Sequence, residues 1–328
     1  IWQREVLGSE DDPESLSARQ VAYWREQLAG LPDQLDLPAD RPRPVVQSFA
    51  GGRVDVRVDA RTHRALAELA RAESATLFMA VHTAFAVLLA RLSGTDDIAI
   101  GTPIAGRGEA ALDDVIGMFV NTLVFRSRVD GAVSFADLLA RQRESDIAAF
   151  ANADVPFERL VEVLNPVRST ARHPLFQVGM SFQNLAQTSL ELPGLTVSGV
   201  DFDTQLSQFD LHLIVADVYG DSGAPEGITG VLTYATDLFE RHTVQGFVDR
   251  FVRLLGQIVS MPRTPVGDLD LLGTAEERRI LIGRNATALA TDRAATLVSL
   301  LDATVDGHAD EVALVGADGD RVTYGELG

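Results

Sequence analysis

The stretch from Asp96 to Val129, DDIAIGTPIAGRGEAALDDVIGMFVNTLVFRSRV, decides how the rest of the chain is interpreted. Three isoleucines lie on either side of a Gly-Thr-Pro break, and a β-branched and aromatic run follows from Phe119 to Phe125. Four glycines in the stretch favour turns or close backbone approaches. The pattern predicts two buried strands joined by a long loop, and a loop of this length between buried strands usually has a function.

The composition is that of a packed globular protein. Hydrophobic residues make up 46% of the 328 residues. The 28 lysines and arginines against 47 aspartates and glutamates give a net charge of −19, which repels phosphate backbones and anionic lipids. Nucleic acid and membranes are therefore not expected partners. The lack of cysteine excludes disulfides and thiolate metal sites, and it is compatible with a cytoplasmic location.

Local motifs predict no self-contained active site. No two of the six histidines are adjacent or spaced like metal ligands on a helix. The segment from Gly179 to Gln183 lacks the second glycine of a nucleophile elbow. His82 lies within an apolar helical pattern, so we expect it to be packed or hydrogen-bonded and not catalytic. We therefore expect no catalytic residue and no bound metal in this segment.

Hydrophobic periodicity predicts an α/β (α+β) fold. The expected helices have apolar residues at helical spacing, and the first is expected to have Ser15 as its N-cap: Ser15–Leu28, Arg61–Ala72, Thr76–Leu92, Ser134–Phe150, Arg159–Leu164 and Val244–Ile258. The other expected strands are Gly52–Asp59, Leu175–Phe182, Thr196–Val200, Phe209–Val218 and Gly227–Tyr234.

The segment from Met261 to Pro265 is typical of a domain edge. We expect residues 1–270 to form one body, residues 271–284 to be a linker, and residues 285–328 to begin a following domain. The last part contains a helical pattern at Thr296–Val305 and a strand pattern at Val312–Val315. About sixty residues cannot bury a comfortable core of their own.

Four segments, taken in order, resemble the core motifs of condensation domains in nonribosomal peptide synthetases. Ile1-Trp2-Gln3 is similar to the end of the fourth motif, and GTPIAGR with IGMFVNTLVFR resembles the fifth. The segment Asn152–Glu158 resembles the sixth motif. Arg168–Leu175 resembles the seventh, although Ser169 and His173 replace the Asp and Asn that are usual there. The segment Val322–Leu327 is close to the first core motif of adenylation domains.

The resemblance implies a chloramphenicol-acetyltransferase-like lobe with a mixed sheet flanked by helices. The family's His-His-x-x-x-Asp-Gly motif is missing here, and its usual place is upstream of the fourth motif. We therefore expect the chain to be the C-terminal part of a condensation domain followed by the beginning of an adenylation (AMP-binding) domain. On its own it should be inactive.

In the intact protein the resemblance implies amide-bond formation between a carrier-bound acyl or peptidyl thioester and an aminoacyl thioester. The implied partners are upstream and downstream peptidyl carrier domains with phosphopantetheine arms, the N-terminal lobe and the adenylation domain, which would use ATP and Mg²⁺. Two alternatives stay open. The chain is a non-catalytic module that docks carriers, or it is an epimerisation or cyclisation relative with the same fold.

The resemblance also points to supporting residues. Arg107 is the expected partner of the motif aspartate on the missing lobe, because a guanidinium binds a carboxylate bidentately; the alternative is a solvated loop arginine. Asn121 and Thr122 either line the channel or bond to the backbone. Asp210 either faces the channel or is solvated at a sheet edge. Asp154 and the Pro156–Glu158 segment are expected to start a helix.

Overall fold

A computed structural model describes residues 5–107, 114–183, 204–220, 222–288 and 294–328. The chain divides into two compact units, residues 1–273 and 274–328. Each is described by itself below, and the proposed division into domains remains a prediction. The strand expected at Thr196–Val200 lies outside the described residues.

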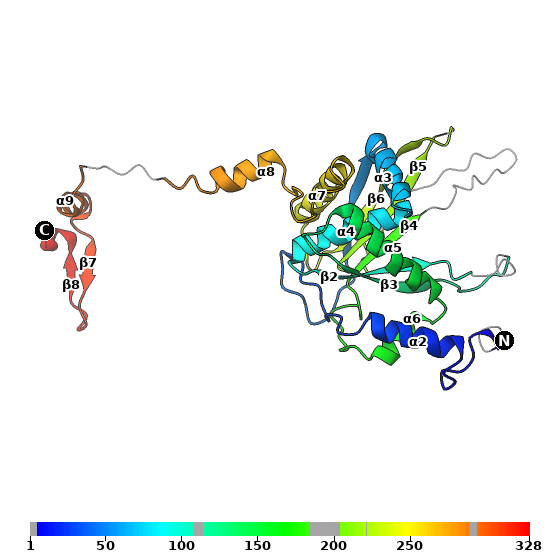
Figure 1. Ribbon diagram of the computed structural model, residues 1–328. Helices are drawn as coiled ribbons and strands as arrows, with labels where there is room; N and C mark the ends of the chain where they lie inside the picture. Colours follow the sequence, from blue (N-terminus) through cyan, green and yellow to red (C-terminus); the bar gives the residue numbers. More distant parts are fainter. Residues whose placement is uncertain (1–4, 108–113, 184–203, 221, 289–293) are drawn as a thin grey trace, which may run out of the picture. The chain divides into compact units, whose positions relative to one another are not determined.

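The first unit is built on one six-stranded sheet (Figure 1). From one edge to the other, the strands are β1 (Gly51–Asp59), β6 (Pro225–Ala235), β5 (Leu211–Tyr219), β4 (Val178–Gln183), β2 (Asp97–Ile104) and β3 (Asn121–Arg128). The β2–β4 and β4–β5 pairs are parallel, and the other pairs are antiparallel. This confirms the expected mixed sheet.

The β2–β3 hairpin differs in one respect from its prediction. Phe119 and Val120 were expected within the second strand, but β3 begins at Asn121, which pairs with Ile104. The reason is that Gly106 takes a left-handed φ of +64°, which ends the extended ladder. A Cβ at this position would lie 1.7 Å from the carbonyl oxygen of Phe119, so only glycine permits this close approach.

The helices agree with the capping and periodicity signals. They are α2 (Leu16–Gln27), α3 (Ala60–Ala72), α4 (Leu77–Ser93), α5 (Phe135–Ala151), α6 (Phe157–Leu164) and α7 (Arg241–Ser260). Ser15 accepts a hydrogen bond from the amide of Ala18, so the predicted N-cap is confirmed. Thr76 caps α4 in the same way, by accepting a hydrogen bond from the amide of Met79. Gly94 ends α4 in the left-handed conformation.

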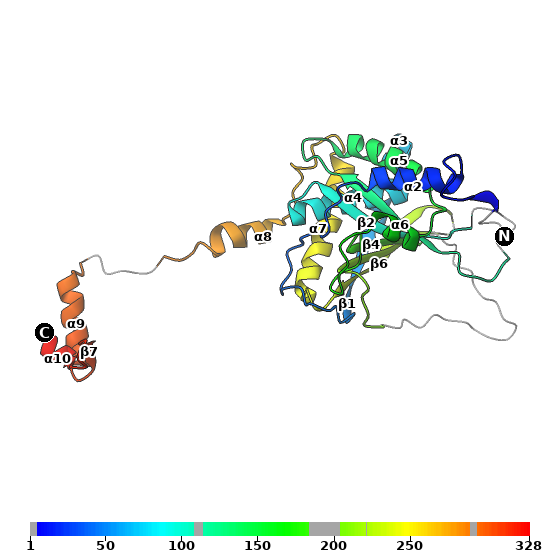
Figure 2. The same ribbon diagram turned by 90° about the horizontal axis from the view of Figure 1, so that it is seen from below.

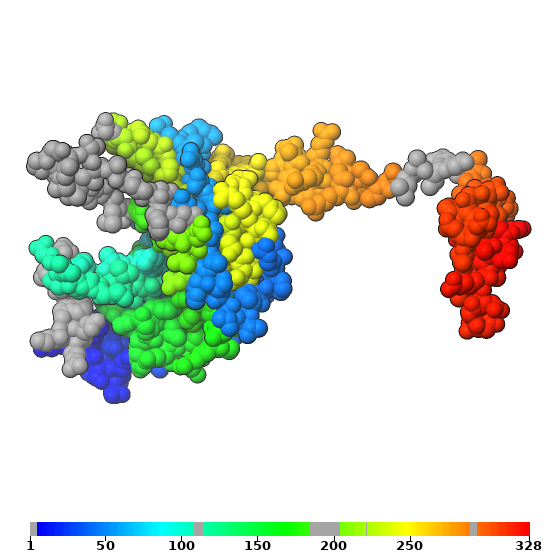
Figure 3. Space-filling model, turned by 180° about the vertical axis from the view of Figure 1, so that it is seen from behind, coloured from blue at the N-terminus to red at the C-terminus, as the bar shows by residue number. Residues whose placement is uncertain are grey.

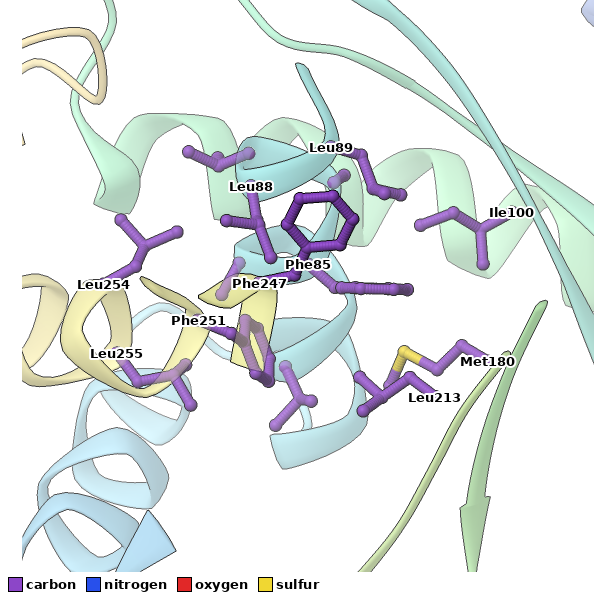
Figure 4. Packing of buried hydrophobic residues seen from close by; sticks show 14 of the residues in the cluster. Phe85, Leu88, Leu89, Ile100, Met180, Leu213, Phe247, Phe251, Leu254 and Leu255 are labelled. Atoms are coloured by element: carbon purple, nitrogen blue, oxygen red, sulfur yellow. The ribbon is translucent and has the colours of Figure 1, made fainter. Parts of the chain in front are cut away.

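The main core lies between one face of the sheet and the helices α3, α4, α5 and α7. Figure 4 shows Phe85 of α4, Phe251 of α7, Met180 of β4 and Leu213 of β5 within this cluster. All seven apolar positions expected on one face of the Val244–Ile258 helix are buried. A second cluster lies beside β3, where α2 and α6 pack around the fully buried Trp24 (Figures 1 and 2).

The opposite face of β1, β6, β5 and β4 is called here the outer face. Its side chains alternate with the core residues and are exposed or half-buried, whereas their neighbours in the strands are buried. The strands β1, in blue, and β5, in yellow-green, reach the surface seen from behind in Figure 3. The outer face includes Asp55, Ser181, His212, Ile214, Thr229 and Val231.

The second unit contains α8 (Thr274–Arg278), the π-helical turn η2 (Arg279–Gly283), α9 (Leu297–His308), β7 (Val312–Val315), β8 (Arg321–Thr323) and α10 (Tyr324–Leu327). Gly319, with a φ of +91°, lies in the turn between the two strands. No described residue of this unit is buried. Apolar side chains of α9 are instead exposed, among them Leu297, Val298 and Leu300.

No single described helix has the length and apolar character needed to cross a membrane. The bent pair of α3 and α4 is together long and apolar enough to span a membrane, but residues 79–90 of α4 are all buried inside the first unit.

Candidate functional site

The loop from residue 105 to residue 120, called here the arm, connects β2 to β3 and carries Arg107. The Nη2 atom of Arg107 donates a hydrogen bond to the carbonyl oxygen of Val115 at 2.8 Å. Its guanidinium carbon lies 4.2 Å from the centroid of the Phe119 ring, a cation–π contact. Arg107 therefore ties the two legs of the arm together. Its expected aspartate partner is not part of this sequence, so its role as a lobe support remains a prediction.

The arm exposes apolar side chains. Val115 and Val120 have 45% and 62% of their surface exposed, and Ile116 and Met118 are almost fully exposed. Neighbouring exposed hydrophobics of this kind are typical of a surface that contacts another part of a protein. The arm thus combines a backbone held by Arg107 with an apolar surface.

Asn121 anchors the base of the arm. Its Nδ2 atom donates to the carbonyl oxygens of Ala153 and Val155, both at 2.9 Å. Its Oδ1 atom accepts from the amides of Thr122 at 2.8 Å and Phe157 at 3.0 Å. Of its two expected roles, the structure shows bonding to the backbone: the side chain holds the start of β3 against the start of α6.

Pro156 and Glu158 lie at the start of α6 as expected, whereas Asp154 does not cap this helix and bonds to α2 instead. Asp154 accepts a hydrogen bond from Nε2 of Gln20 at 2.8 Å, and its own amide donates back to Oε1 of the same side chain. Pro156 is the N-cap residue of α6, and Glu158 lies in its first turn. Thr122 is half-buried and pairs with Pro103 across the hairpin.

Asp210 is buried, so the alternative of a carboxylate solvated at a sheet edge is wrong. Arg43 holds it bidentately, with Nη1 2.8 Å from Oδ1 and Nη2 in contact with Oδ2. The Asp210 amide donates to the carbonyl oxygen of Gln177. The carboxylate thus fastens the proline-rich segment of Arg43 to the start of β5, and its oxygens are already engaged. Sequence reasoning missed Arg43 because the two residues lie 167 positions apart.

A second buried ion pair was also missed, although the signal was present. Arg126 binds both carboxylate oxygens of Asp97 at 2.7 and 2.8 Å, and its Nη1 donates to the carbonyl oxygens of Gln27 and Ala29 after α2. Arg128, directly opposite Asp97 in the hairpin, adds a contact of 3.0 Å. In the predicted hairpin, the acidic residue at the start of the first strand lies opposite the basic residues at the end of the second strand. These opposite charges would have indicated the pair.

Ser181 and His212 form a polar pair on the outer face. The Oγ atom of Ser181 lies 2.9 Å from Nε2 of His212, on the neighbouring parallel strand. Burial lowers the pKa of His212 to about 4, so the ring is neutral at pH 7. Sequence reasoning considered the Gly179–Gln183 segment only as a nucleophile elbow and did not connect it with His212.

His82 is packed, as expected. It is fully buried in α4 between Phe78 and Phe125, with ring centroids 5.8 and 5.4 Å away, and burial lowers its pKa to about 3. Among the described residues, no group of three or more His, Cys, Asp or Glu side chains could hold a metal ion.

Comparison with known proteins identifies the fold. Residues 2–281 match the condensation-domain family. The chain is 46% identical over 317 residues to the probable non-canonical nonribosomal peptide synthetase CymA of Salinispora arenicola, covering 96% of this chain and 4% of that protein. It is 48% identical over 276 residues to a dimodular nonribosomal peptide synthase of Bacillus subtilis, covering 84% and 12%.

Solved structures, among them one of a nonribosomal peptide synthetase, contain the same fold as this chain. The X-domain from teicoplanin biosynthesis superposes with a TM-score of 0.78 at 33% identity, over 83% of this chain and 61% of that chain. A four-domain nonribosomal peptide synthetase bound to AMP and glycine superposes with a TM-score of 0.80 at 26% identity, over 97% and 25%.

The chain therefore spans only a small part of these synthetases and about three fifths of the X-domain structure. Its mixed sheet flanked by helices is the chloramphenicol-acetyltransferase-like fold of condensation domains. By sequence and by fold, the chain belongs to the condensation-domain family of nonribosomal peptide synthetases.

Proposed function

We propose that the first unit is the C-terminal lobe of a condensation domain that joins a carrier-bound acyl or peptidyl thioester to a carrier-bound aminoacyl thioester. The observation that carries the proposal is the arm. Its exposed apolar side chains, Val115, Ile116, Met118 and Val120, extend from a base anchored by Asn121 and suit contact with a second lobe. The absence of the His-His-x-x-x-Asp-Gly motif from this sequence agrees with a catalytic histidine on that other lobe.

In this reaction the amine of one thioester attacks the carbonyl carbon of the other. The amide C–N bond forms, the C–S bond breaks, and the proton lost by the amine balances the thiolate that leaves. The phosphopantetheine arms of the carrier domains supply the thioesters. Two lobes that hold both arms in one channel convert a bimolecular encounter into a nearly unimolecular step. The second motif histidine would position or deprotonate the amine.

The residues of this lobe then have supporting roles. Arg107 keeps the arm in shape, and we expect it also to bind the motif aspartate of the other lobe. Asn121 and Asp210 act as supports of the channel wall, because their polar atoms are engaged by α6 and by Arg43. The half-buried Thr122 is the candidate to line the channel itself.

The second unit is proposed to begin an adenylation domain, whose remaining part would bind ATP and Mg²⁺. Its apolar α9 face, exposed at Leu297 and Leu300, would then be covered by the rest of that domain. Limited proteolysis tests this division. Cleavage between Gly273 and Thr296 should leave the first unit intact and degrade the tail, because Val266 and Leu269 are still buried in the main core. A single resistant body that extends to Gly328 would contradict it.

Amide formation itself is tested with two loaded carrier domains and mass spectrometry of the product. The full synthetase should form the amide, a variant with alanine at the second motif histidine should lose it, and the present chain alone should form none. Amide product from this chain alone would overturn the assignment of catalysis to the other lobe. Carrier binding without product from the full synthetase would favour a non-catalytic docking module.

A further inference from the structure

The Ser181–His212 pair has a geometry that depends on its neighbours in the sheet. In the parallel register of β4 and β5, His212 lies opposite Gly179, and the imidazole extends from there to the hydroxyl of Ser181, two residues along β4. A Cβ at position 179 would lie 3.0 Å from Cδ2 of His212. The glycine therefore leaves the space in which the imidazole crosses the strand.

An aromatic group holds the imidazole in this position. The ring of Phe209 meets His212 edge-on, with centroids 5.3 Å apart and an interplanar angle of 85°. Phe209 in turn packs against the buried Phe176 at 5.4 Å and against His173 at 5.1 Å. The orientation of His212, and with it the hydrogen bond to Ser181, is fixed by packing from one side.

The other side of the pair is accessible. Ser181 and His212 are both half-buried, the following outer-face residue Ile214 is half-buried, and Gln183 is exposed. On the opposite side of the sheet, Met180 and Leu213 are buried in the main core. A ligand can therefore reach the Ser181 hydroxyl only from the outer face.

The chemistry of the pair indicates which ligand group it would bind. Because the imidazole is neutral at pH 7, one ring nitrogen carries a proton and the other offers a lone pair. With the lone pair on Nε2, the ring accepts the hydroxyl proton of Ser181. The oxygen of Ser181 then presents its lone pairs outward and accepts a hydrogen bond from an N–H donor. An amine supplies such a donor, whereas a thioester carbonyl does not.

We propose that Ser181 binds the attacking amine of the aminoacyl thioester through its hydroxyl oxygen, and that His212 is the positioning residue that orients this hydroxyl. The inference rests on the proposed function, because it needs an amine substrate. The amine would then be held by two groups, the histidine expected on the other lobe and the Ser181 hydroxyl of this lobe. The pair itself takes no part in bond making, and its effect is to hold the amine nitrogen where attack occurs.

The test uses the full synthetase with loaded carriers and separate titrations of the donor and the aminoacyl carrier. Ser181→Ala removes the oxygen, and we expect kcat/KM for the aminoacyl carrier to fall about 10- to 100-fold, as for the loss of one strong hydrogen bond. The donor KM should not change. His212→Phe keeps an aromatic ring beside Phe209 but removes the acceptor nitrogen, and it should give a similar loss. Ser181→Thr restores the hydroxyl in a residue suited to a strand and should rescue activity to within about threefold.

Ser93→Ala is the matched control, because Ser93 bonds only locally at the end of α4, to the carbonyl oxygen of Leu89 and the amide of Thr95. It should retain wild-type kinetics. If the wild type forms amide and Ser181→Ala behaves like it, the inference is overturned and the proposed function stands. Failure of Ser181→Thr to rescue, together with a lowered melting temperature of Ser181→Ala, would show a structural role and also overturn it. If the wild-type synthetase forms no amide, the proposed function fails and this inference fails with it.

Discussion

The two ends of the β2–β3 hairpin use arginine in different ways. At the base, Arg126 and Asp97 have side chains only 6% and 7% exposed and form a bidentate ion pair that also holds the end of α2. At the tip, Arg107 bonds within the arm, to a carbonyl oxygen and an aromatic ring. Both arginines lie in segments that resemble the fifth motif, but of the two only Arg126 is held in a buried ion pair. Prominence in a motif and contribution to stability are therefore separate properties.

Breaking the pair at the base should have the largest effect. Asp97→Ala leaves Arg126 buried without its carboxylate, and we expect it to lower the free energy of unfolding of the first unit by about 3–5 kcal/mol. Urea denaturation measures this loss. The control is Asp96→Ala, which changes the adjacent, exposed aspartate and should stay within about 0.5 kcal/mol of wild type. Equal effects of the two substitutions would contradict the comparison.

A second buried carboxylate sharpens the comparison, because it has a different environment. Asp146 in α5 is fully buried and accepts a hydrogen bond from Gln142, but its Oδ2 atom has no partner among the described residues. Burial raises the pKa of Asp146 to about 7. Asp97 has the Arg126 guanidinium beside it, whereas Asp146 has no cation among its partners in the described part of the chain. If the guanidinium is what makes a buried carboxylate stable, then ionised Asp146 should destabilise the fold.

The sign of the pH dependence follows from linkage. A carboxyl whose pKa is raised in the folded state contributes stability below its unfolded pKa, about 4, and that contribution is lost as the pH rises towards 7. Between pH 5 and pH 8 we expect this group to cost about 2–3 kcal/mol. Asp146→Asn should remove that part of the pH dependence and stabilise the protein at pH 8, as measured by urea denaturation at both values. An unchanged pH slope would show that Asp146 is not the group responsible.

Local features of the fold were predictable from the sequence. The N-cap Ser15 and the seven apolar positions on one face of α7 are set by neighbouring residues, so both agree with the structure. The β3 start was displaced by two residues because Gly106 ends the ladder, a contact across the arm that periodicity does not encode.

The polar contacts of the candidate site were harder to predict. Asp210 was selected, but its partner Arg43 is distant in sequence and is brought near by the proline-rich segment. The contact between Ser181 and His212 depends on the parallel register of β4 and β5, and a sequence alone does not give the order of strands in a sheet. Residue type indicated possible chemistry, and topology decided which residues meet.

Substitution of Asn121 tests how much its anchoring of the starts of β3 and α6 contributes to stability. Asn121→Ala removes the side chain that bonds to four backbone groups at the starts of β3 and α6, and we expect a loss of about 2 kcal/mol. Asn121→Asp keeps an acceptor for the amides of Thr122 and Phe157 but loses the donor to Ala153 and Val155. It should therefore lie between wild type and alanine. Thermal unfolding compares the three proteins, and an alanine variant as stable as wild type would exclude the anchoring role.

Arg107 should give the smallest effect in this chain. Arg107→Ala removes a hydrogen bond near the surface and one cation–π contact, which together are worth about 1 kcal/mol. Arg57→Ala is the control, because its side chain is 83% exposed on β1 and should contribute less than that. In the full condensation domain the same Arg107 substitution should cost about 3–5 kcal/mol if the motif aspartate binds the guanidinium in a buried pair.

The difference between the loss in this chain and the loss in the complete condensation domain is thus the measurement that decides the role of Arg107. A large loss in the complete domain alone would show that a surface loop arginine becomes a buried support when the second lobe is present. An equally small loss in both would leave Arg107 as a fastener of the arm, and the lobe contact would then rest on Val115, Ile116, Met118 and Val120. A loss in this chain as large as that of Asp97→Ala would contradict the comparison between the base and the tip of the hairpin.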